Sequence, residues 1–345
     1  LLTSVATQGV APYREVLCHG WVVDAQGKQM HKSAGNGMEP SEIIRDYGAD
    51  IIRLWVASSD YTVDVRAGKE IFRQLSEAYR KMRNTARFML GNISDFDPAK
   101  DMVDDDQLFE IDRWALEACN KHYDFSRAYH ALYNFCVIDM SNFYMDVIKD
   151  RLYCADDHAR RCAQTALYRI LVDFTKLLAP ILCFTSQEIW SYIPKLDGMK
   201  DYVVFEQMPE AKAAADEAFE AKWDRIMAIR DDVKKVLEQA RADKVIGSAL
   251  EAGLTLYCSK EVYDFLNAIP MDELADLMIV SHVDLVKGEG GVKGLTEGLG
   301  MSVAHAAGNK CLRCWKVLPT VGSDAQHPEL CPRCAAVAKT FPDLA

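Results

Sequence analysis

The sequence predicts a mainly α-helical protein in four parts, which we expect at residues 1–67, 68–210, 211–300 and 301–345. Three observations support this fold class. In the first part an extended segment, a polar loop and a helix follow one another, which indicates the end of an α/β domain. From Lys69 onward, apolar residues recur every three or four positions, as in amphipathic helices. The last part carries two closely spaced pairs of cysteines, which indicate a small cysteine-rich fold.

Composition indicates a soluble globular protein. Half of the 345 residues are hydrophobic, which is enough to build several cores. Charged residues and Pro180 interrupt the longest apolar stretch, residues 170–190, so we expect no membrane-spanning segment and no membrane partner. The chain starts at Leu1, inside what the pattern indicates is a structured element, and we therefore expect a piece of a longer polypeptide.

The net charge and the cysteines limit which kinds of nucleic-acid binding and which cellular compartment fit this chain. The net charge of −11 excludes a uniformly basic nucleic-acid coat, so any RNA contact must rest on local basic patches. The eleven cysteines are odd in number, which argues against a disulfide framework and favours a reducing compartment, the cytoplasm. Most of those outside the tail lie singly in apolar or helical patterns, which favours buried free thiols.

Residues 27–36 form a small polar loop, Gly-Lys-Gln-Met-His-Lys-Ser-Ala-Gly-Asn. It follows a predicted strand at residues 15–24 and precedes a helix predicted to open at Pro40. Glycines lower the cost of unusual backbone angles, so the loop can close on an anion. Lys32 is then placed to stabilise negative charge on a transferring or departing phosphate.

Two other interpretations of this loop compete with a phosphate-binding role of this kind. The phosphate loop of nucleoside triphosphatases is excluded, because its two required glycines fall on Gln26 and His31. An ordinary basic hairpin remains the alternative to a phosphate-binding loop.

A long amphipathic helix is predicted from Lys69 to about Asn92. Its buried stripe consists of Ile71, Leu75, Ala78, Tyr79, Met82, Ala86 and Met89. On the other face, Arg80, Arg83 and Arg87 lie within one arc with Arg73, in a stretch rich in basic residues. We identify Arg80, Arg83 and Arg87 as candidate contacts to RNA phosphates, with a solvated helix face as the alternative.

Further helices complete the predicted bundle. Residues 114–153 are rich in aromatics at mostly helical spacing, which favours core packing over base stacking. A third helix is predicted at about residues 164–178, and Pro180 breaks or kinks it. Antiparallel helices with short connections fit a bundle.

The third part of the chain, residues 211–300, mixes helical and strand patterns. A long helix is predicted at residues 219–243, followed by strands at 254–258 and 277–286 around a helix at about 261–268. This pattern predicts a small α+β domain, in which we find no catalytic constellation. The lone His282 is interpreted as structural.

Four cysteines carry the strongest chemical signal. Cys311-x2-Cys314 and Cys331-x2-Cys334, separated by sixteen residues, have the spacing of a four-thiolate structural zinc site. Such a site leaves no open coordination position, so the metal holds the fold and does not activate water. Two disulfides or an iron-sulfur centre are the alternatives. His305 and His327 could each replace a thiolate, but the four cysteines already fill the site.

The cysteine-rich tail is basic within an acidic protein. Residues 301–345 carry five basic and three acidic side chains. Arg313 and Arg333 are candidate RNA contacts, and Trp315 is a candidate for base stacking. A role for Trp315 as a lid over the zinc sulfurs is the alternative.

Several segments resemble one enzyme family. Gln29-Met30-His31-Lys32-Ser33 resembles the Lys-Met-Ser-Lys-Ser signature loop of class I aminoacyl-tRNA synthetases, with Gln29 and His31 as departures. The resemblance implies that Lys32 meets the triphosphate of ATP, in the presence of magnesium, while Gln29, Met30, His31 and Ser33 shape the loop. The role of the family's first lysine does not carry over to Gln29.

The resemblance extends along the chain. Residues 48–61 are similar to the stem that follows the signature loop in the isoleucine, valine and leucine enzymes, and residues 179–190 to a hallmark of their anticodon-binding bundle. In the tail, the segments Cys-Leu-Arg-Cys-Trp (residues 311–315) and Cys-Pro-Arg-Cys (residues 331–334) resemble the zinc finger of bacterial isoleucyl-tRNA synthetases. The second and third parts then correspond to the anticodon-binding bundle and the junction domain, and the first to the end of a Rossmann-like catalytic domain.

The resemblance implies a ligase that activates isoleucine with ATP and transfers it to tRNA(Ile), as a monomer. Elements for binding isoleucine would lie upstream, so we expect this chain to be inactive alone. A non-catalytic tRNA-binding zinc module, or half of a split synthetase, is the alternative, and an unrelated zinc-ribbon protein is a weaker one.

Overall fold

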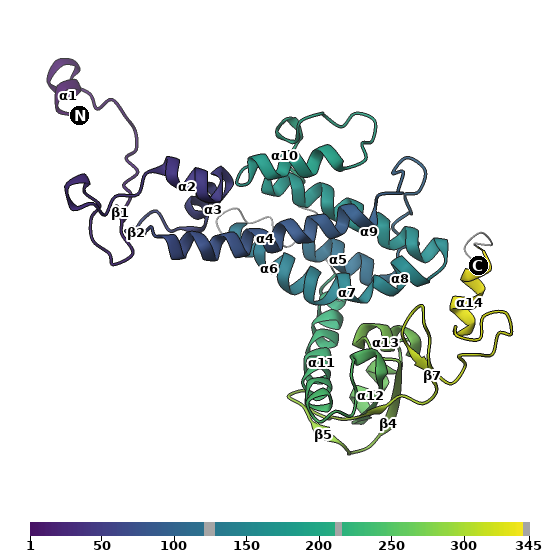
Figure 1. Cartoon of the computed structure of the whole chain (residues 1–345). Helices are drawn as coiled ribbons and strands as arrows, with labels where there is room; N and C mark the ends of the chain where they lie inside the picture. Colours follow the sequence, from purple (N-terminus) through teal and green to yellow (C-terminus); the bar gives the residue numbers. More distant parts are fainter. Residues whose placement is uncertain (121–127, 211–215, 341–345) are drawn as a thin grey trace.

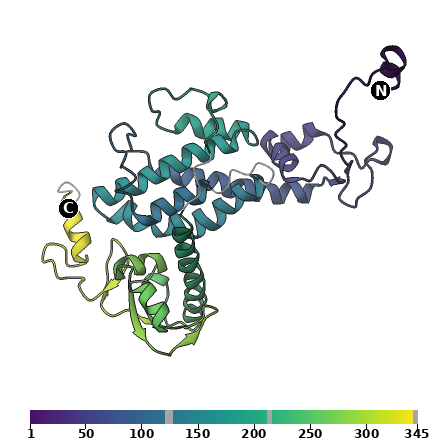
Figure 2. The same ribbon diagram turned by 180° about the vertical axis from the view of Figure 1, so that it is seen from behind.

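The computed structural model describes residues 1–120, 128–210 and 216–340. A helical bundle forms the middle of the molecule, and the N-terminal segment extends from one end of it (Figure 1). A long helix, α11, leads from the bundle to a small α/β unit. The cysteine-rich tail, described over residues 301–340, then returns towards the other end of the bundle, as the view from behind also shows (Figure 2).

The N-terminal part contains little regular sheet. Helix α1 (Leu2–Gln8) is followed by strand β1 (Val22–Val23), which pairs in parallel with β2 (Val65–Arg66). The strand predicted at residues 15–24 is therefore wrong except for its last residues. A strand needs a neighbour for its backbone hydrogen bonds, and only the Val22–Val23 pair has one in a ladder here. Trp21, just before β1, is 67% exposed.

Two short helices form the stem. Helices α2 (Pro40–Tyr47) and α3 (Ala49–Ser58) meet at Gly48, whose φ of 94° lies in the region that favours glycine. Asp50 and Arg53 of α3 both contact the bundle. Arg53 donates to the carbonyls of Pro180 (2.6 Å) and Ile181 (2.8 Å), at the corner that Pro180 creates.

The bundle agrees with the periodicity of the sequence. Its elements are α4 (Lys69–Asn92), α5 (Glu110–Asn120), α6 (Ala128–Asn134), a π-helix (Phe135–Tyr144), α7 (Met145–Val147), α8 (Lys149–Cys154), α9 (Asp157–Leu178), α10 (Cys183–Tyr192) and a 3₁₀ turn (Val203–Phe205). The helix predicted to start near residue 164 begins seven residues earlier, because Asp156 accepts a hydrogen bond from the Ala159 N–H and caps it.

Helix α9 is the centre of the bundle core. It contacts α4, α5, α8 and α10, and most of its length is buried. Several aromatics predicted as core are fully buried, among them Phe135, Phe143 and Tyr144. Tyr123 and Phe125 of the same prediction lie outside the described residues. The Tyr144 hydroxyl donates to Asp112 (2.7 Å), which is also paired with Arg151, so this buried carboxylate is satisfied.

Helix α11 (Glu217–Ala242) connects the bundle to a four-stranded sheet of order β4-β3-β6-β5. The strands are β3 (Ala252–Cys258), β4 (His282–Lys287), β5 (Val292–Lys293) and β6 (Leu299–His305). β3 and β4 are parallel, joined by helices α12 (Lys260–Leu266) and α13 (Met271–Met278), and a 3₁₀ turn (Ala249–Glu251) precedes β3. The strand predicted at residues 277–286 is thus wrong in its first half, because Leu277 and Met278 end α13 and residues 279–281 form a turn before β4.

The tail contains β7 (Asn309–Lys310), β8 (Val317–Leu318) and α14 (Pro332–Ala338). β7 and β8 form a short antiparallel ribbon. Within the described parts of the chain, no helix combines the length and apolar character needed to cross a bilayer.

Candidate functional site

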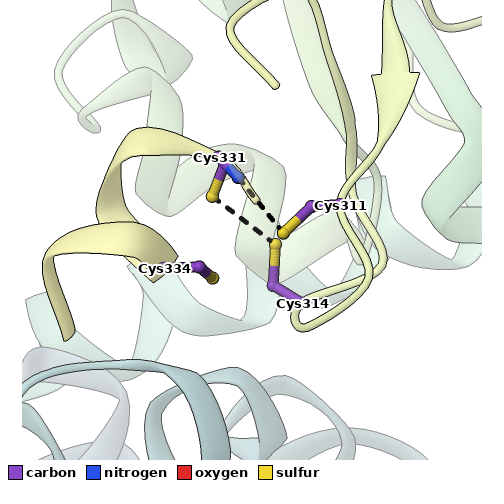
Figure 3. A group of neighbouring side chains, drawn as sticks. All are labelled: Cys311, Cys314, Cys331 and Cys334. Atoms are coloured by element: carbon purple, nitrogen blue, oxygen red, sulfur yellow. Dashed lines mark hydrogen bonds between the residues drawn. The ribbon is translucent and has the colours of Figure 1, made fainter. Parts of the chain in front are cut away.

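The four tail cysteines converge on one point. Cys311, Cys314, Cys331 and Cys334 are all buried, and their sulfur atoms lie within 4.8 Å of one another. The sulfurs of Cys314 and Cys331 are 3.9 Å apart, and the Cys331 N–H donates to the sulfur of Cys311 at 3.4 Å (Figure 3). The two pairs thus face each other across a small gap.

The local sequence explains this geometry. The first pair spans a turn in which the Trp315 N–H donates to the Cys311 carbonyl (2.9 Å), with Trp315 itself at φ 65°. In the second pair, Pro332 occupies the first position of α14, where a missing N–H costs nothing, so Cys331 and Cys334 lie at the start of the helix. One turn and one helix start each present two thiols to the same side.

The cluster fits zinc. Tetrahedral coordination with Zn–S bonds of about 2.3 Å places sulfurs about 3.8 Å apart, close to the Cys314–Cys331 separation. Four soft thiolates fill the coordination sphere, and neither His305 nor His327 belongs to the group. The cysteines therefore form one structural zinc site, as the sequence predicted.

A hydrogen bond between Asn36 and Asp24 holds the predicted phosphate loop together, and we call it the Asn36–Asp24 clasp. Asn36 donates from Nδ2 to Asp24 (2.9 Å) and to the carbonyl of Gln29 (3.1 Å), and its Oδ1 accepts from the His31 N–H (3.0 Å). Asp24 also accepts from the N–H groups of Gln26 and Lys28. The Asn36 amide and the Lys28 N–H hold the pKa of Asp24 below its ordinary value.

The residues of the predicted signature loop, residues 29–33, differ in how exposed they are. Gln29, His31 and Ser33 are exposed, whereas Met30 packs against the core and anchors the loop. Lys32 begins a 3₁₀ turn (Lys32–Ala34), and its side chain lies outside what the structure describes. Sequence reasoning missed Asp24 and Asn36. The signal was present: an Asp that ends an extended run commonly accepts from nearby backbone N–H groups.

The α4 arginines lie on an exposed face. Arg80, Arg83 and Arg87 are all exposed, and Arg83 makes a 3.3 Å contact with Glu188 of α10. Arg73, on the same helix, is held between Glu70 and Glu77 at 2.7 Å from each, so its charge is largely compensated. The structure thus brings the predicted stripe to the surface.

The tail candidates differ in their surroundings. Trp315 is 61% exposed, and its ring is outside the buried cysteine cluster. Arg313 donates to the carbonyls of Tyr153 and Cys154, and Arg333 forms an ion pair with Asp150. Both arginines therefore already have partners on α8, and their contact with RNA stays a prediction.

Three parts of the chain match the sequence patterns of known protein families. Residues 1–68 match tRNA synthetases class I (I, L, M and V), residues 112–256 match the anticodon-binding domain of tRNA ligase, and residues 308–337 match a zinc finger found in FPG and IleRS. These matches cover the predicted phosphate loop, most of the bundle and the four cysteines.

Curated relatives match the chain from end to end. Isoleucine–tRNA ligases of Moorella thermoacetica and Syntrophotalea carbinolica are 47% and 48% identical over 98% of this chain, which covers 38% of each relative. A solved methionyl-tRNA synthetase of Mycobacterium tuberculosis is similar over 55% of this chain and 40% of its own, at 16% identity and a TM-score of 0.44. The chain spans little more than a third of the length of these curated relatives, and over that span it is similar to the isoleucine–tRNA ligases and to the class I tRNA synthetases.

Proposed function

We propose that this chain supplies the phosphate loop, the anticodon-binding helices and the zinc tail of an enzyme that joins isoleucine to tRNA(Ile). The observation that carries the proposal is the identity of 47–48% to isoleucine–tRNA ligases over 98% of the chain. Because the chain corresponds to 38% of those relatives, we assign the complete activity to it together with an upstream portion that binds isoleucine.

The proposed chemistry uses the clasped loop. In the activation step the carboxylate of isoleucine attacks the α-phosphorus of ATP and pyrophosphate departs. Magnesium that enters with ATP neutralises part of the phosphate charge. Lys32 stabilises the charge that develops on the departing phosphates. The Asn36–Asp24 clasp fixes the loop base, and Gly27 (φ 84°) and Gly35 (φ 65°) allow the backbone to turn at its ends.

The proposed RNA contacts combine two surfaces. Arg80, Arg83 and Arg87 place exposed cations along α4, where they bind phosphates, and the exposed ring of Trp315 stacks on a base. Arg313 and Arg333 contribute less directly, because α8 already accepts their hydrogen bonds. We propose that the protein acts as a monomer in the cytoplasm, a reducing compartment in which the four zinc thiolates persist.

Isoleucine-dependent exchange of pyrophosphate into ATP tests the proposal. The upstream portion of a close relative is mixed with this chain, and each half is also assayed alone. We expect exchange only from the mixture, and we expect Lys32→Ala to abolish it with little change in tRNA affinity. Gln29→Lys, which restores the family's first lysine, serves as the matched variant and should retain or increase the rate.

A second candidate is a tRNA-binding zinc module without catalysis. The observations that favour it are the match of residues 112–256 to an anticodon-binding domain and the cluster of four buried cysteines. A mixture that shows no exchange, while this chain alone binds tRNA, would replace the ligase proposal with this one.

A further inference from the structure

The tail contacts both ends of α8 through the same position of its two cysteine pairs. Arg313 stands in Cys-Leu-Arg-Cys and Arg333 in Cys-Pro-Arg-Cys, each directly before the second zinc ligand of its pair. Both guanidinium groups point to α8 (Lys149–Cys154). Two separate knuckles of one metal site therefore hold one helix of the bundle.

The Arg313 contact closes the end of the helix. Its guanidinium donates to the carbonyls of Tyr153 and Cys154, at 3.1 Å each. Carbonyls of a last helical turn lack partners within the helix and carry partial negative charge, so a cation there is favourable. The Cys154 thiol returns a hydrogen bond to the Arg313 carbonyl (3.5 Å) and packs among the four zinc cysteines.

The Arg333 contact is an ion pair at the start of α8. The two nitrogens of Arg333 reach the two carboxylate oxygens of Asp150, one of them at 2.7 Å. The Asp150 side chain is only 17% exposed. Paired hydrogen bonds between arginine and a shielded carboxylate are stronger and more directional than a single surface contact.

We propose that Arg313 and Arg333 act as a zinc-dependent clamp, which docks the tail on α8 only when the metal holds both knuckles. Zinc fixes the backbone on each side of both arginines, so it positions two guanidinium groups at once. Without zinc each knuckle is free to open, and the two contacts no longer form together. Metal occupancy is thereby coupled to the position of the tail on the bundle.

The clamp has a consequence for RNA binding, which rests on the proposed tRNA function. Tyr153, whose carbonyl Arg313 holds, also lines a shallow groove of about 450 Å³ with Arg87 and Phe88 of α4. The clamp thus joins the tail to the helix end beside the basic face of α4. We assign Arg313 and Arg333 as positioning residues that align Trp315 with this face.

Amide hydrogen exchange of the full chain, with one zinc per chain verified by native mass spectrometry, tests docking without RNA. The main variants are Arg313→Ala and Asp150→Asn, the second of which leaves the tail sequence intact. Asp146→Asn is the matched control, because Asp146 pairs with the exposed Lys149 and not with an arginine of the tail. We expect exchange in residues 149–155 to rise at least tenfold in the two variants, with zinc retained, and to stay unchanged in the control.

Zinc removal and charge exchange complete the test. A chelator should raise exchange in residues 149–155 of the wild type as much as the Arg313→Ala, Asp150→Asn double variant does, and should add nothing in that double variant. Asp150→Arg with Arg333→Asp should restore protection that Asp150→Arg alone loses. Unchanged protection in the double variant, or additive effects of zinc removal, would overturn the clamp.

Anisotropy with a labelled anticodon stem-loop RNA tests the consequence. We expect the zinc-loaded double variant to bind at least fivefold more weakly than wild type. Wild-type affinity in an undocked variant would overturn the alignment of Trp315. If the wild type itself binds no RNA while the exchange results hold, the clamp is supported and the proposed tRNA function fails.

Discussion

Asp50 of the stem caps a helix of the bundle through Thr185, whose N–H donates to the carboxylate at 2.8 Å and whose hydroxyl donates at 2.6 Å. Thr185 lies in the first turn of α10, where backbone N–H groups lack partners within the helix. The contact therefore fastens the α2–α3 stem, which follows the predicted phosphate loop, to the helical bundle.

Asp50→Ala should lower the free energy of unfolding by about 1–2 kcal/mol, the usual cost of losing a helix cap. Asp50 is 7% exposed, so water replaces its hydrogen bonds poorly. Urea denaturation of the full chain measures the change. The control is Asp46→Ala, since Asp46 pairs with Arg45 at the surface and should cost no more than about 0.5 kcal/mol. Equal losses in the two variants would refute the capping role.

Asn36→Ala should raise the pKa of Asp24 toward the ordinary value of about 3.9. The Asn36 amide is the main cause of the lowered pKa of Asp24, ahead of the Lys28 N–H. Because that pKa is lowered in the folded chain, the clasp is complete above about pH 4 and opens as the pH falls through the lowered value. Carboxyl NMR during an acid titration reports the pKa directly. Gln26→Ala is the control, and a pKa of Asp24 that does not move in Asn36→Ala would contradict the clasp.

Asp232 should contribute to the stability of the α+β unit in a pH-dependent way. Burial raises its pKa, but hydrogen bonds from Leu295 and Thr296 outweigh burial and lower the pKa to about 2. The contribution is therefore fully present above about pH 4 and is lost as the pH falls towards 2. Asp232→Asn should cost about 1–2 kcal/mol at pH 7, and the difference from wild type should shrink between pH 4 and pH 2. Asp231→Asn, at the exposed neighbour, is the control in urea titrations.

Cys334→Ser should abolish binding of the one zinc ion per chain and unfold residues 308–340. The four thiolates are the ligand set, and a tail with so small a core depends on its metal. Native mass spectrometry and circular dichroism measure the two effects. Cys154→Ser is the matched control, because Cys154 packs beside the cluster but lies outside the group of four. Zinc loss in Cys154→Ser would show that the bundle supplies a ligand.

The zinc ligands and the long helices were predictable because their determinants are local. Two Cys-x2-Cys pairs specify a site by spacing alone, and the apolar stripe of α4 repeats within one element. The strand predicted at residues 15–24 failed because β-branched residues indicate an extended chain but do not supply a pairing partner. Leu277 is buried and apolar in a helix as it would be in a strand, so its short run was ambiguous.

The contacts between parts were not predictable from one sequence. Asp50 and Thr185 are 135 residues apart, and Arg333 and Asp150 are 183 apart. The residues next to Asp50 and Arg53 in the sequence do not indicate that Asp50 caps another helix or that Arg53 donates to two carbonyls. A surface ion pair between Asp50 and Arg53 would fit the same sequence. Only the position of the α9–α10 corner reveals their role.

Replacing Arg80, Arg83 and Arg87 with alanine should weaken tRNA binding. All three are exposed on one face of α4, and cations at such positions bind phosphates with a strong dependence on salt. Each single change should reduce affinity about threefold to tenfold and lower the slope of log affinity against log salt by about 0.7–0.9. Filter binding across a salt series measures both quantities. Arg73→Ala is the matched control, because Glu70 and Glu77 already neutralise Arg73 on the same helix. If the three changes leave affinity and slope as in Arg73→Ala, the RNA must bind another face of the bundle.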